Sequence, residues 1–202
     1  MAIATIDISH RVTLIGSTGD GKTTLGLKIL RRVVEAKQLP IVILNPWAEE
    51  SLYELFGEGR PDIDTTFPAV QHVTPPATLD YKNYGRIFGQ ILLHGNVGVF
   101  IDEVAGVGDA HNFSVMLKTM YQGGRRRNVF TVGVTQRPLD IPAFILKMSE
   151  HIFIGDVMGQ DLKKVEEHTQ QRFADAIQSR QQYEFLYWSR LLKEPPKAVR
   201  MD

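Results

Sequence analysis

The stretch GSTGDGKT, from Gly16 to Thr23, directly follows the apolar run VTLI of residues 12–15. It matches the phosphate-loop pattern GxxxxGK[ST], in which glycines let backbone N–H groups turn toward an anion at the positive end of the next helix. In such a loop Lys22 is expected to reach the β- and γ-phosphates, and the Thr23 hydroxyl to ligate Mg²⁺. The alternative interpretation of the bare pattern is a glycine-rich turn before a helix.

The residues around this stretch favour a nucleotide site. Residues 24–37 carry Leu25, Ile29 and Val33 at four-residue spacing, which predicts an amphipathic helix directly after the loop. Gly26 lowers helix propensity there, and we expect it to allow close packing of the helix on a sheet. We therefore predict that the nucleotide contacts these residues: Gly16, Ser17, Thr18, Gly19, Asp20, Gly21, Lys22, Thr23 and Thr24.

Length and composition indicate an intracellular protein with one domain. The 202 residues suffice for one well-buried domain, with residues 1–10 expected as a leader and residues 193–202 as a loosely held tail. No apolar run approaches the ~18 residues of a transmembrane segment, and the N-terminus lacks the pattern of a signal peptide. The absence of cysteine excludes disulfides and thiolate metal sites.

The net charge is zero, but the charges are unevenly distributed. Residues 1–117 hold nine Lys/Arg against thirteen Asp/Glu, and residues 118–202 hold fourteen against ten. An anionic partner for the second half is one interpretation of this asymmetry, and an ordinary solvated surface is the other.

Apolar runs and turn residues predict alternating strands and helices, hence an α/β fold with a mostly parallel sheet flanked by helices. The paired glycines at 123–124 are expected to end a helix in a left-handed conformation. Strands are expected at residues 11–15, 41–44, 69–73, 97–101, 128–135, 151–154 and 183–188. Helices are expected at residues 24–37, 47–56, 80–94, 113–122, 142–148 and 161–176.

The segment VGVFIDE, residues 97–103, is an apolar strand that ends in two adjacent carboxylates. Carboxylates at the carboxyl end of a central strand are costly without a cation, and Mg²⁺ would supply one. Asp102 fits the acid that holds the metal, and Glu103 fits the general base that orients water toward the γ-phosphate. A strand end with two solvated acids is the structural alternative.

Two further candidates are a glutamine that follows a predicted strand and a basic triplet that follows a predicted helix. Gln136 ends an apolar strand, where its amide could sense the γ-phosphate or simply be a polar strand end. Arg125, Arg126 and Arg127 form a basic triplet, and a guanidinium group can bind phosphate bidentately. One of them could act as an arginine finger on a neighbouring subunit, while others contact a nucleic-acid backbone; a solvated basic turn is the alternative.

The four segments GSTGDGKT, VGVFIDE, GRRR and VTQRP resemble motifs of the FtsK–HerA superfamily of DNA-pumping P-loop ATPases, over residues 11–155. In that superfamily an arginine stands eleven positions before the glutamine of a TQRP segment, as Arg125 stands before Gln136 here. Within this superfamily, the small chain is most similar to the genome-packaging ATPases of tailless icosahedral viruses with an internal membrane, and specifically to those of archaeal viruses.

This resemblance implies a RecA-like fold of the ASCE class and a hexameric ring that translocates double-stranded DNA with ATP and Mg²⁺. It implies Lys22, Glu103, Gln136 and Arg125 as catalytic residues, with Arg125 as the finger supplied in trans, and Thr23 and Asp102 as metal ligands. It also implies a location in the virion or the host cytoplasm, with capsid or membrane proteins of the virion as possible partners. The superfamily usually has serine where this chain has Asp20. A carboxylate beside bound phosphates is repulsive unless it turns outward or meets a cation, and of these we expect it to point to solvent.

For the remaining candidate residues, the sequence favours structural roles. His72, His94 and His151 lie in or beside apolar segments and are expected to be packing residues. The aromatic residues of segment 183–188 could stack on nucleic-acid bases, but a terminal strand with such residues more often belongs to the core or a subunit contact.

The sequence leaves three other functions open. The first is a cellular HerA-like translocase, and the second is a nucleotide-dependent assembly switch, which Glu103 disfavours because a switch needs no general base. The third is a small-molecule kinase, for which no acceptor-binding segment is visible. ATP rather than GTP is implied by the resemblance, and the chain lacks an NKxD-type guanine signal.

Overall fold

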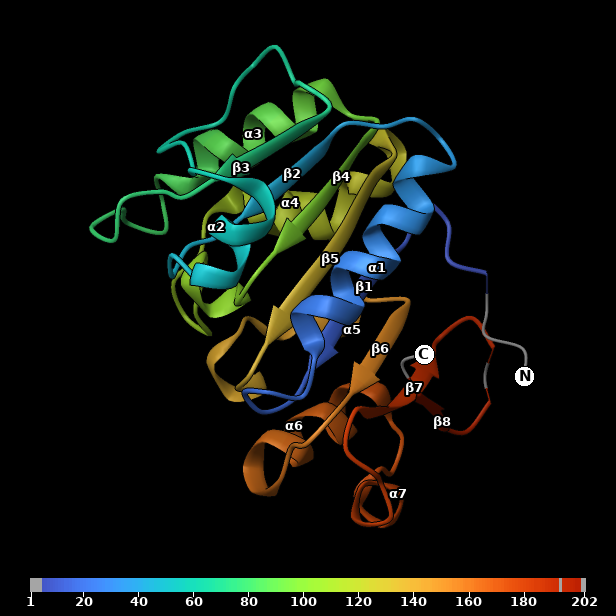
Figure 1. Ribbon diagram of the computed structural model, residues 1–202. Coiled ribbons are helices and arrows are strands. Elements are labelled where there is room, and N and C mark those ends of the chain that lie inside the picture. The colour runs from blue at the N-terminus through green and yellow to red at the C-terminus, as the bar shows by residue number, and fades with distance from the viewer. Residues whose placement is uncertain (1–4, 193, 201–202) are drawn as a thin grey trace.

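The computed structural model describes residues 5–192 and 194–200, which fold around one eight-stranded sheet of order β3-β2-β4-β5-β1-β6-β7-β8 (Figure 1). The first six strands pair in parallel, and β7 and β8 add to one edge in antiparallel fashion. The strands are β1 (Arg11–Ile15), β2 (Ile41–Leu44), β3 (Val70–Val73), β4 (Val97–Ile101), β5 (Val129–Thr135), β6 (His151–Ile154), β7 (Glu184–Ser189) and β8 (Lys197–Arg200).

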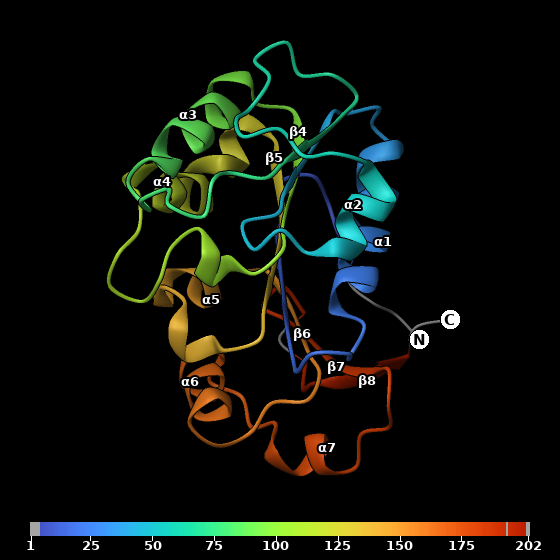
Figure 2. The same cartoon turned by 60° about the vertical axis from the view of Figure 1, so that its left-hand side comes forward.

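Helices cover both faces of the sheet. The α-helices are α1 (Lys22–Glu35), α2 (Glu50–Phe56), α3 (Tyr84–His94), α4 (Val115–Gly123), α5 (Ala143–Met148), α6 (Gly159–Thr169) and α7 (Ala174–Gln178). The described residues also form three short 3₁₀ helices, η1 (Val104–Gly106), η2 (Gly124–Arg127) and η3 (Pro138–Asp140). Figure 2 shows α1 and α2 on one side of the sheet, and α3, α4, α5 and α6 on the other.

The strands β1, β2, β4, β5, β6 and β7 supply residues to two hydrophobic layers, because successive side chains of a strand point to opposite faces. Ile41 and Ile43 belong to the layer under α1, whereas Val42 and Leu44 belong to the layer under α3 and α4. A Cβ at Gly26 of α1 would lie 2.8 Å from a ring carbon of Phe100. This confirms the expected close packing of the first helix on the sheet.

Most predicted elements are confirmed, with ends that differ by a few residues. The strands at residues 11–15, 41–44, 97–101 and 151–154 have the predicted bounds. The predicted helix 47–56 begins only at Glu50, since Asn45 binds the backbone of Glu49 and holds a turn there. No helix among the described residues is long and apolar enough to cross a membrane.

Three expectations about the helices and strands are wrong. The glycines at 123–124 are not left-handed, because η2 continues the turn after α4 and the left-handed residue is Asn128, with φ 53°. The predicted helix 161–176 is two helices, since Gln170 adopts φ 57° and ends α6. Part of the predicted loose tail forms the edge strand β8, whereas residues 193, 201 and 202 lie outside the described residues.

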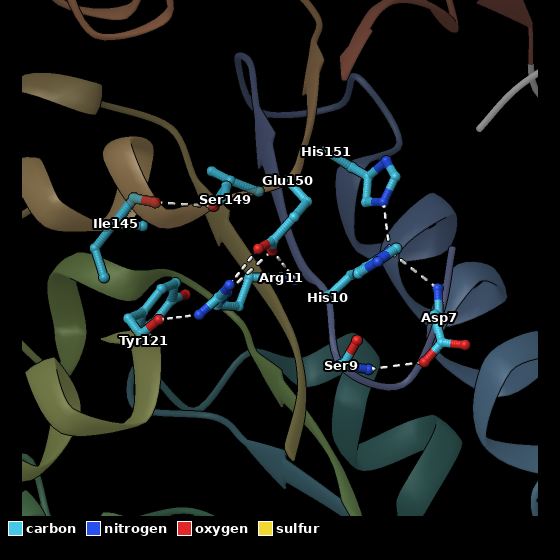
Figure 3. Close-up of polar contacts among 10 residues, drawn as sticks. Asp7, Ser9, His10, Arg11, Tyr121, Ile145, Ser149, Glu150 and His151 are labelled. Atoms are coloured by element: carbon cyan, nitrogen blue, oxygen red, sulfur yellow. Dashed lines mark hydrogen bonds and ion pairs between the residues drawn. The ribbon is translucent and has the colours of Figure 1, made fainter. Parts of the chain in front are cut away.

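The amino ends of β1 and β6 are closed by buried polar side chains (Figure 3). Glu150 accepts hydrogen bonds from the backbone N–H of Arg11 at 2.7 Å and from its Nε at 3.0 Å, and the same guanidinium also donates to the carbonyl of Tyr121. We call Arg11, Glu150 and Tyr121, together with His10 and His151, the closed polar cluster.

The predicted leader joins this cluster in part. His10 and His151 share a hydrogen bond of 2.9 Å between Nδ1 and Nε2, and Ile6 and Ile8 pack against the hydrophobic layer under α1. Residues 1–4 lie outside the described residues. His151 is fully buried and also contacts the Tyr187 hydroxyl at 2.9 Å, which confirms it as a packing residue.

Candidate functional site

The phosphate loop connects β1 to α1 at the carboxyl ends of the parallel strands. Gly19 and Gly21 both have φ 86°, a left-handed conformation that costs glycine little. A Cβ added at Gly19 would meet no atom within 4 Å, so the loop is open on that side. The buried Lys22 folds back along the loop and donates from Nζ to the carbonyl of Ser17 at 2.6 Å. Burial lowers the pKa of Lys22, opposed by the nearby carboxylates.

Asp20 does not point to solvent, contrary to the expectation from sequence. Its Oδ2 accepts backbone N–H bonds from Ser17 at 2.9 Å and from Asp156 at 2.7 Å. Its Oδ1 lies 3.5 Å from Nη2 of Arg180. The carboxylate is thus buried behind the loop, because donors from the chain after β6 surround it.

The metal-ligand candidates meet beside the loop. Thr23, in the first turn of α1, donates from Oγ1 to Oδ1 of Asp102 at 2.9 Å. Asp102 follows β4 and is only 6% exposed. Burial raises the pKa of Asp102 to about 6, opposed by the Thr23 hydrogen bond. A hydroxyl and a carboxylate side by side are the oxygen ligands that Mg²⁺ prefers, so these two residues fit the metal.

Glu103 is held in a strained backbone conformation with φ 67°, a region that non-glycine residues rarely adopt. Its Oε1 accepts from the Thr135 hydroxyl at 2.9 Å and from the backbone N–H of Ala105 at 3.4 Å. Its Oε2 accepts from the backbone N–H of Gln136 at 2.9 Å. Burial raises the pKa of Glu103, and these hydrogen bonds oppose that effect.

Gln136 connects the acidic pair to the phosphate loop. It follows β5, which lies in the sheet between β1 and β4 and therefore between the two motifs. Besides the backbone bond to Glu103, its side-chain Oε1 accepts a hydrogen bond of 3.0 Å from the Thr18 hydroxyl. The sheet order thus places the predicted sensor where its amide contacts the loop.

These residues line one pocket of about 720 Å³. Of the predicted residues it takes in Thr18, Gly19, Gly21, Lys22, Thr23, Thr24, Asp102, Glu103 and Gln136. Gly16, Ser17 and Asp20 are outside its lining and lie on the back of the loop, where Gly16 leaves room for the Asp20 carboxylate.

The pocket also contains residues that sequence reasoning missed: Trp47, Glu49, Ser51, Ala105, Val134, Arg137, Asp140 and Tyr183. Arg137 could have been found, because it follows Gln136 at the end of the same strand. The sequence predicts Tyr183 as the first residue of a terminal strand, yet it lies just before β7, has φ 60° and is 46% exposed. No local pattern places it in the pocket lining.

Arg125 does not line this pocket. It lies in η2, immediately before β5, whereas Gln136 lies immediately after β5. A strand of seven residues separates the two ends by about 23 Å at 3.3 Å per residue. Arg125, Arg126 and Arg127 are exposed at the amino end of the sheet, so Arg125 cannot serve the pocket of its own chain from there.

The pocket fits a nucleoside triphosphate with Mg²⁺. An open glycine loop, a lysine and a helix that begins at Lys22 form a cradle for phosphate. Asp102, Glu103 and Glu49 beside the same lysine make the pocket acidic, and a divalent cation would offset that charge. The donor set therefore combines an anion cradle with oxygen ligands for a hard cation.

Comparison with solved structures finds similar folds at low sequence identity. The chain resembles the genome packaging NTPase B204 from Sulfolobus turreted icosahedral virus 2, solved with ATP-γS, at TM-score 0.80 and 16% identity over 96% of this chain and 99% of that one. It also resembles VirB4 of Thermoanaerobacter pseudethanolicus, at TM-score 0.66 and 10% identity over 100% and 93% of the two chains.

A KaiC-like protein from Pyrococcus horikoshii is more distant, with TM-score 0.54 and 13% identity over 94% of this chain and 84% of that one. No protein-family model matches the sequence, and no curated protein matches it. These likenesses concern the fold, and they agree with the predicted mostly parallel sheet flanked by helices. The chain therefore has the fold of the P-loop NTPases.

Proposed function

We propose that this protein is a Mg²⁺-dependent ATPase that works as a ring and moves double-stranded DNA, in the packaging of a viral genome into a preformed capsid. One observation carries the enzymatic part: Lys22, Thr23, Asp102, Glu103 and Gln136 come from three different strand ends and line a single pocket. Structural similarity to a protein described as a genome packaging NTPase supports the motor part.

Each pocket residue has a proposed role that follows from its position. Lys22 and the loop N–H groups would bind the triphosphate, and Thr23 with Asp102 would hold Mg²⁺, which neutralises phosphate charge when bound. Glu103 would accept a proton from the attacking water, and burial, which raises its pKa, favours that role. Its three donors fix the carboxylate at the end of β4, which orients it before water enters.

A ring would explain the position of Arg125. The exposed triplet lies at the end of the sheet remote from the chain's own pocket, so it is free to contact the pocket of a neighbour. A guanidinium supplied in trans would stabilise transition-state charge and couple hydrolysis to assembly. The remaining arginines of η2 would then be available to a DNA backbone.

The first test is steady-state ATP hydrolysis against protein concentration, with and without double-stranded DNA. We expect the rate per subunit to rise with self-association and with DNA. Glu103→Gln should still bind ATP but lose at least 10²-fold in rate, because the general base is removed. Turnover that is indifferent to DNA and concentration would leave a hydrolase and contradict the motor. Binding without turnover in the unmodified protein would favour the assembly switch.

The role of Arg125 is tested by mixing two inactive variants. Arg125→Ala retains Lys22, and Lys22→Ala retains Arg125, so mixed rings contain some interfaces with both groups intact. We expect the mixture to recover part of the activity that each variant alone lacks. Arg126→Ala and Arg127→Ala are the matched controls, since they remove the same charge at adjacent positions. If no arginine variant recovers activity when it is mixed with Lys22→Ala, the proposal of an arginine finger in trans is contradicted.

A further inference from the structure

The Asp20 carboxylate is the least expected group in the phosphate loop, and its contacts reach far along the chain. Oδ2 accepts from the backbone N–H of Ser17 within the loop and of Asp156 after β6. Oδ1 faces the guanidinium of Arg180, which lies between α7 and β7. One side chain therefore joins the loop to two segments of the second half of the chain.

Two glycines make room for this carboxylate. A Cβ at Gly16 would lie 2.4 Å from Oδ2 of Asp20, and a Cβ at Gly155 would lie 2.6 Å from the same oxygen. Real Cβ atoms do not approach an oxygen so closely, so either side chain would displace the carboxylate. The space on both sides of Asp20 is thus matched to a carboxylate that turns inward.

Arg180 is itself fixed by its surroundings. Its side chain is 9% exposed, and Nη1 donates to the carbonyl of Gln181 at 3.2 Å and of Glu184 at 2.8 Å. These bonds orient the guanidinium and leave Nη2 toward Asp20. The same short segment carries Tyr183 into the lining of the pocket. Arg180 therefore connects the pocket wall to the phosphate loop.

We propose that Arg180 is a positioning residue for the nucleotide, which neutralises the Asp20 carboxylate behind the phosphate loop and fixes the segment that bears Tyr183. This inference rests on the proposed nucleotide site. A buried carboxylate next to a bound triphosphate would repel it, and that repulsion is weakly screened away from water. With Arg180 paired to it, Asp20 can shape the loop without that cost.

The proposal is tested by Arg180→Met, alone and with Asp20→Asn. We expect Arg180→Met to weaken binding of a non-hydrolysable ATP analogue about tenfold, since truncating one partner of a buried pair leaves the other charge uncompensated. Asn at position 20 can accept both backbone N–H bonds through one oxygen while carrying no charge. The double variant Asp20→Asn/Arg180→Met should therefore bind the analogue nearly as well as the unmodified protein.

The number of phosphates separates an electrostatic role from a structural one. Weakening in Arg180→Met should be largest for the ATP analogue, smaller for ADP and smallest for AMP, as titration calorimetry of all three with Mg²⁺ would measure. Arg172→Met removes an exposed arginine of the same region and is the matched control. Thermal unfolding of each variant shows whether the fold is intact.

Two failures are distinguishable. If the unmodified protein binds none of the three nucleotides, the proposed function fails. If it binds them, but Arg180→Met binds all three as the unmodified protein does, the inference is overturned. It is equally overturned if Arg180→Met weakens all three alike and the double variant restores none of them.

Discussion

At the amino ends of β1 and β6, Arg11 and Glu150 are enclosed by protein, whereas at the carboxyl ends of β1 and β4, Lys22 and Asp102 line an open pocket. Both ends bury charged groups. In the closed polar cluster the side chains of Arg11 and Glu150 are 8% and 12% exposed and satisfy each other. The pocket is lined by four carboxylates and two cations, and Glu49, Asp102 and Glu103 lie beside Lys22.

The difference separates charges that satisfy one another within the fold from charges that are left open to a ligand. A closed ion pair with hydrogen bonds to its remaining donors needs no further partner and leaves no room for a ligand. In the pocket, an excess of carboxylates lies beside a loop whose N–H groups can bind an anion. This arrangement favours a ligand that brings both a cation for the carboxylates and phosphate for the loop. Changes at the closed end should therefore alter stability, and changes at the open end should alter turnover.

The largest effect is expected from Glu150→Met. It leaves the buried Arg11 guanidinium without a counter-charge and should lower the free energy of unfolding by about 3–5 kcal/mol, measured by urea denaturation. Hydrolysis per folded molecule should be unchanged. The double variant Arg11→Met/Glu150→Met should recover most of the loss, since both charges are removed; a double variant as unstable as the single one would contradict the paired role.

The complementary change is Lys22→Met at the open end. It should lower kcat/KM for ATP by about 10²–10³-fold, because a donor aimed at developing phosphate charge is lost. The free energy of unfolding should change little, since burial already disfavours the charged form of Lys22. Kinetics and urea denaturation on the same preparation make the comparison. A variant that loses stability but keeps its turnover would reverse the two assignments.

The histidines of the closed polar cluster also predict that the stability of the fold depends on pH. Burial, and then His10, lower the pKa of His151 to about 4 from 6.5. The unfolded chain therefore binds more protons between these values, so stability is present above pH 6.5 and lost as pH falls toward 4. This loss should reach about 3 kcal/mol, at 1.36 kcal/mol per pKa unit.

Denaturation of the protein and of His151→Gln at several pH values isolates this contribution. The glutamine carries no titratable group, so its stability should fall less steeply with acid. Hydrolysis at pH 7 should be the same for both proteins. Equal slopes for the two proteins would show that His151 does not carry the effect.

The smallest effect is expected at the contact between Thr18 and Gln136. Thr18→Ala removes one exposed hydrogen bond of 3.0 Å, and we expect a two- to tenfold decrease in kcat, from about 0.5–1.5 kcal/mol. Thr18→Ser keeps the hydroxyl and should retain the rate. An unchanged rate in Thr18→Ala would show that this contact does not position the glutamine for catalysis.

Local sequence patterns were sufficient to predict a candidate site residue when the element that positions it is adjacent to it in the sequence. The phosphate loop, its strand and its helix are contiguous, so residues 11–37 predict their own arrangement. Asp102 and Glu103 were found in the same way, because a buried strand followed by carboxylates marks the edge of a sheet where ligands bind. That these two motifs meet at one pocket required the order β4-β5-β1, which is set by pairing of distant strands.

From the sequence alone, the α/β fold class and nine of the residues that line the pocket can be predicted, since both follow from local periodicity and spacing. Only the folded chain shows that Asp20 turns inward, that Arg180 reaches the phosphate loop, that Tyr183 lines the pocket, and that residues 197–200 join the sheet. Each of those features depends on a partner far along the chain. The direction of a polar side chain is set by the donors that the fold brings to it, and no short pattern specifies them.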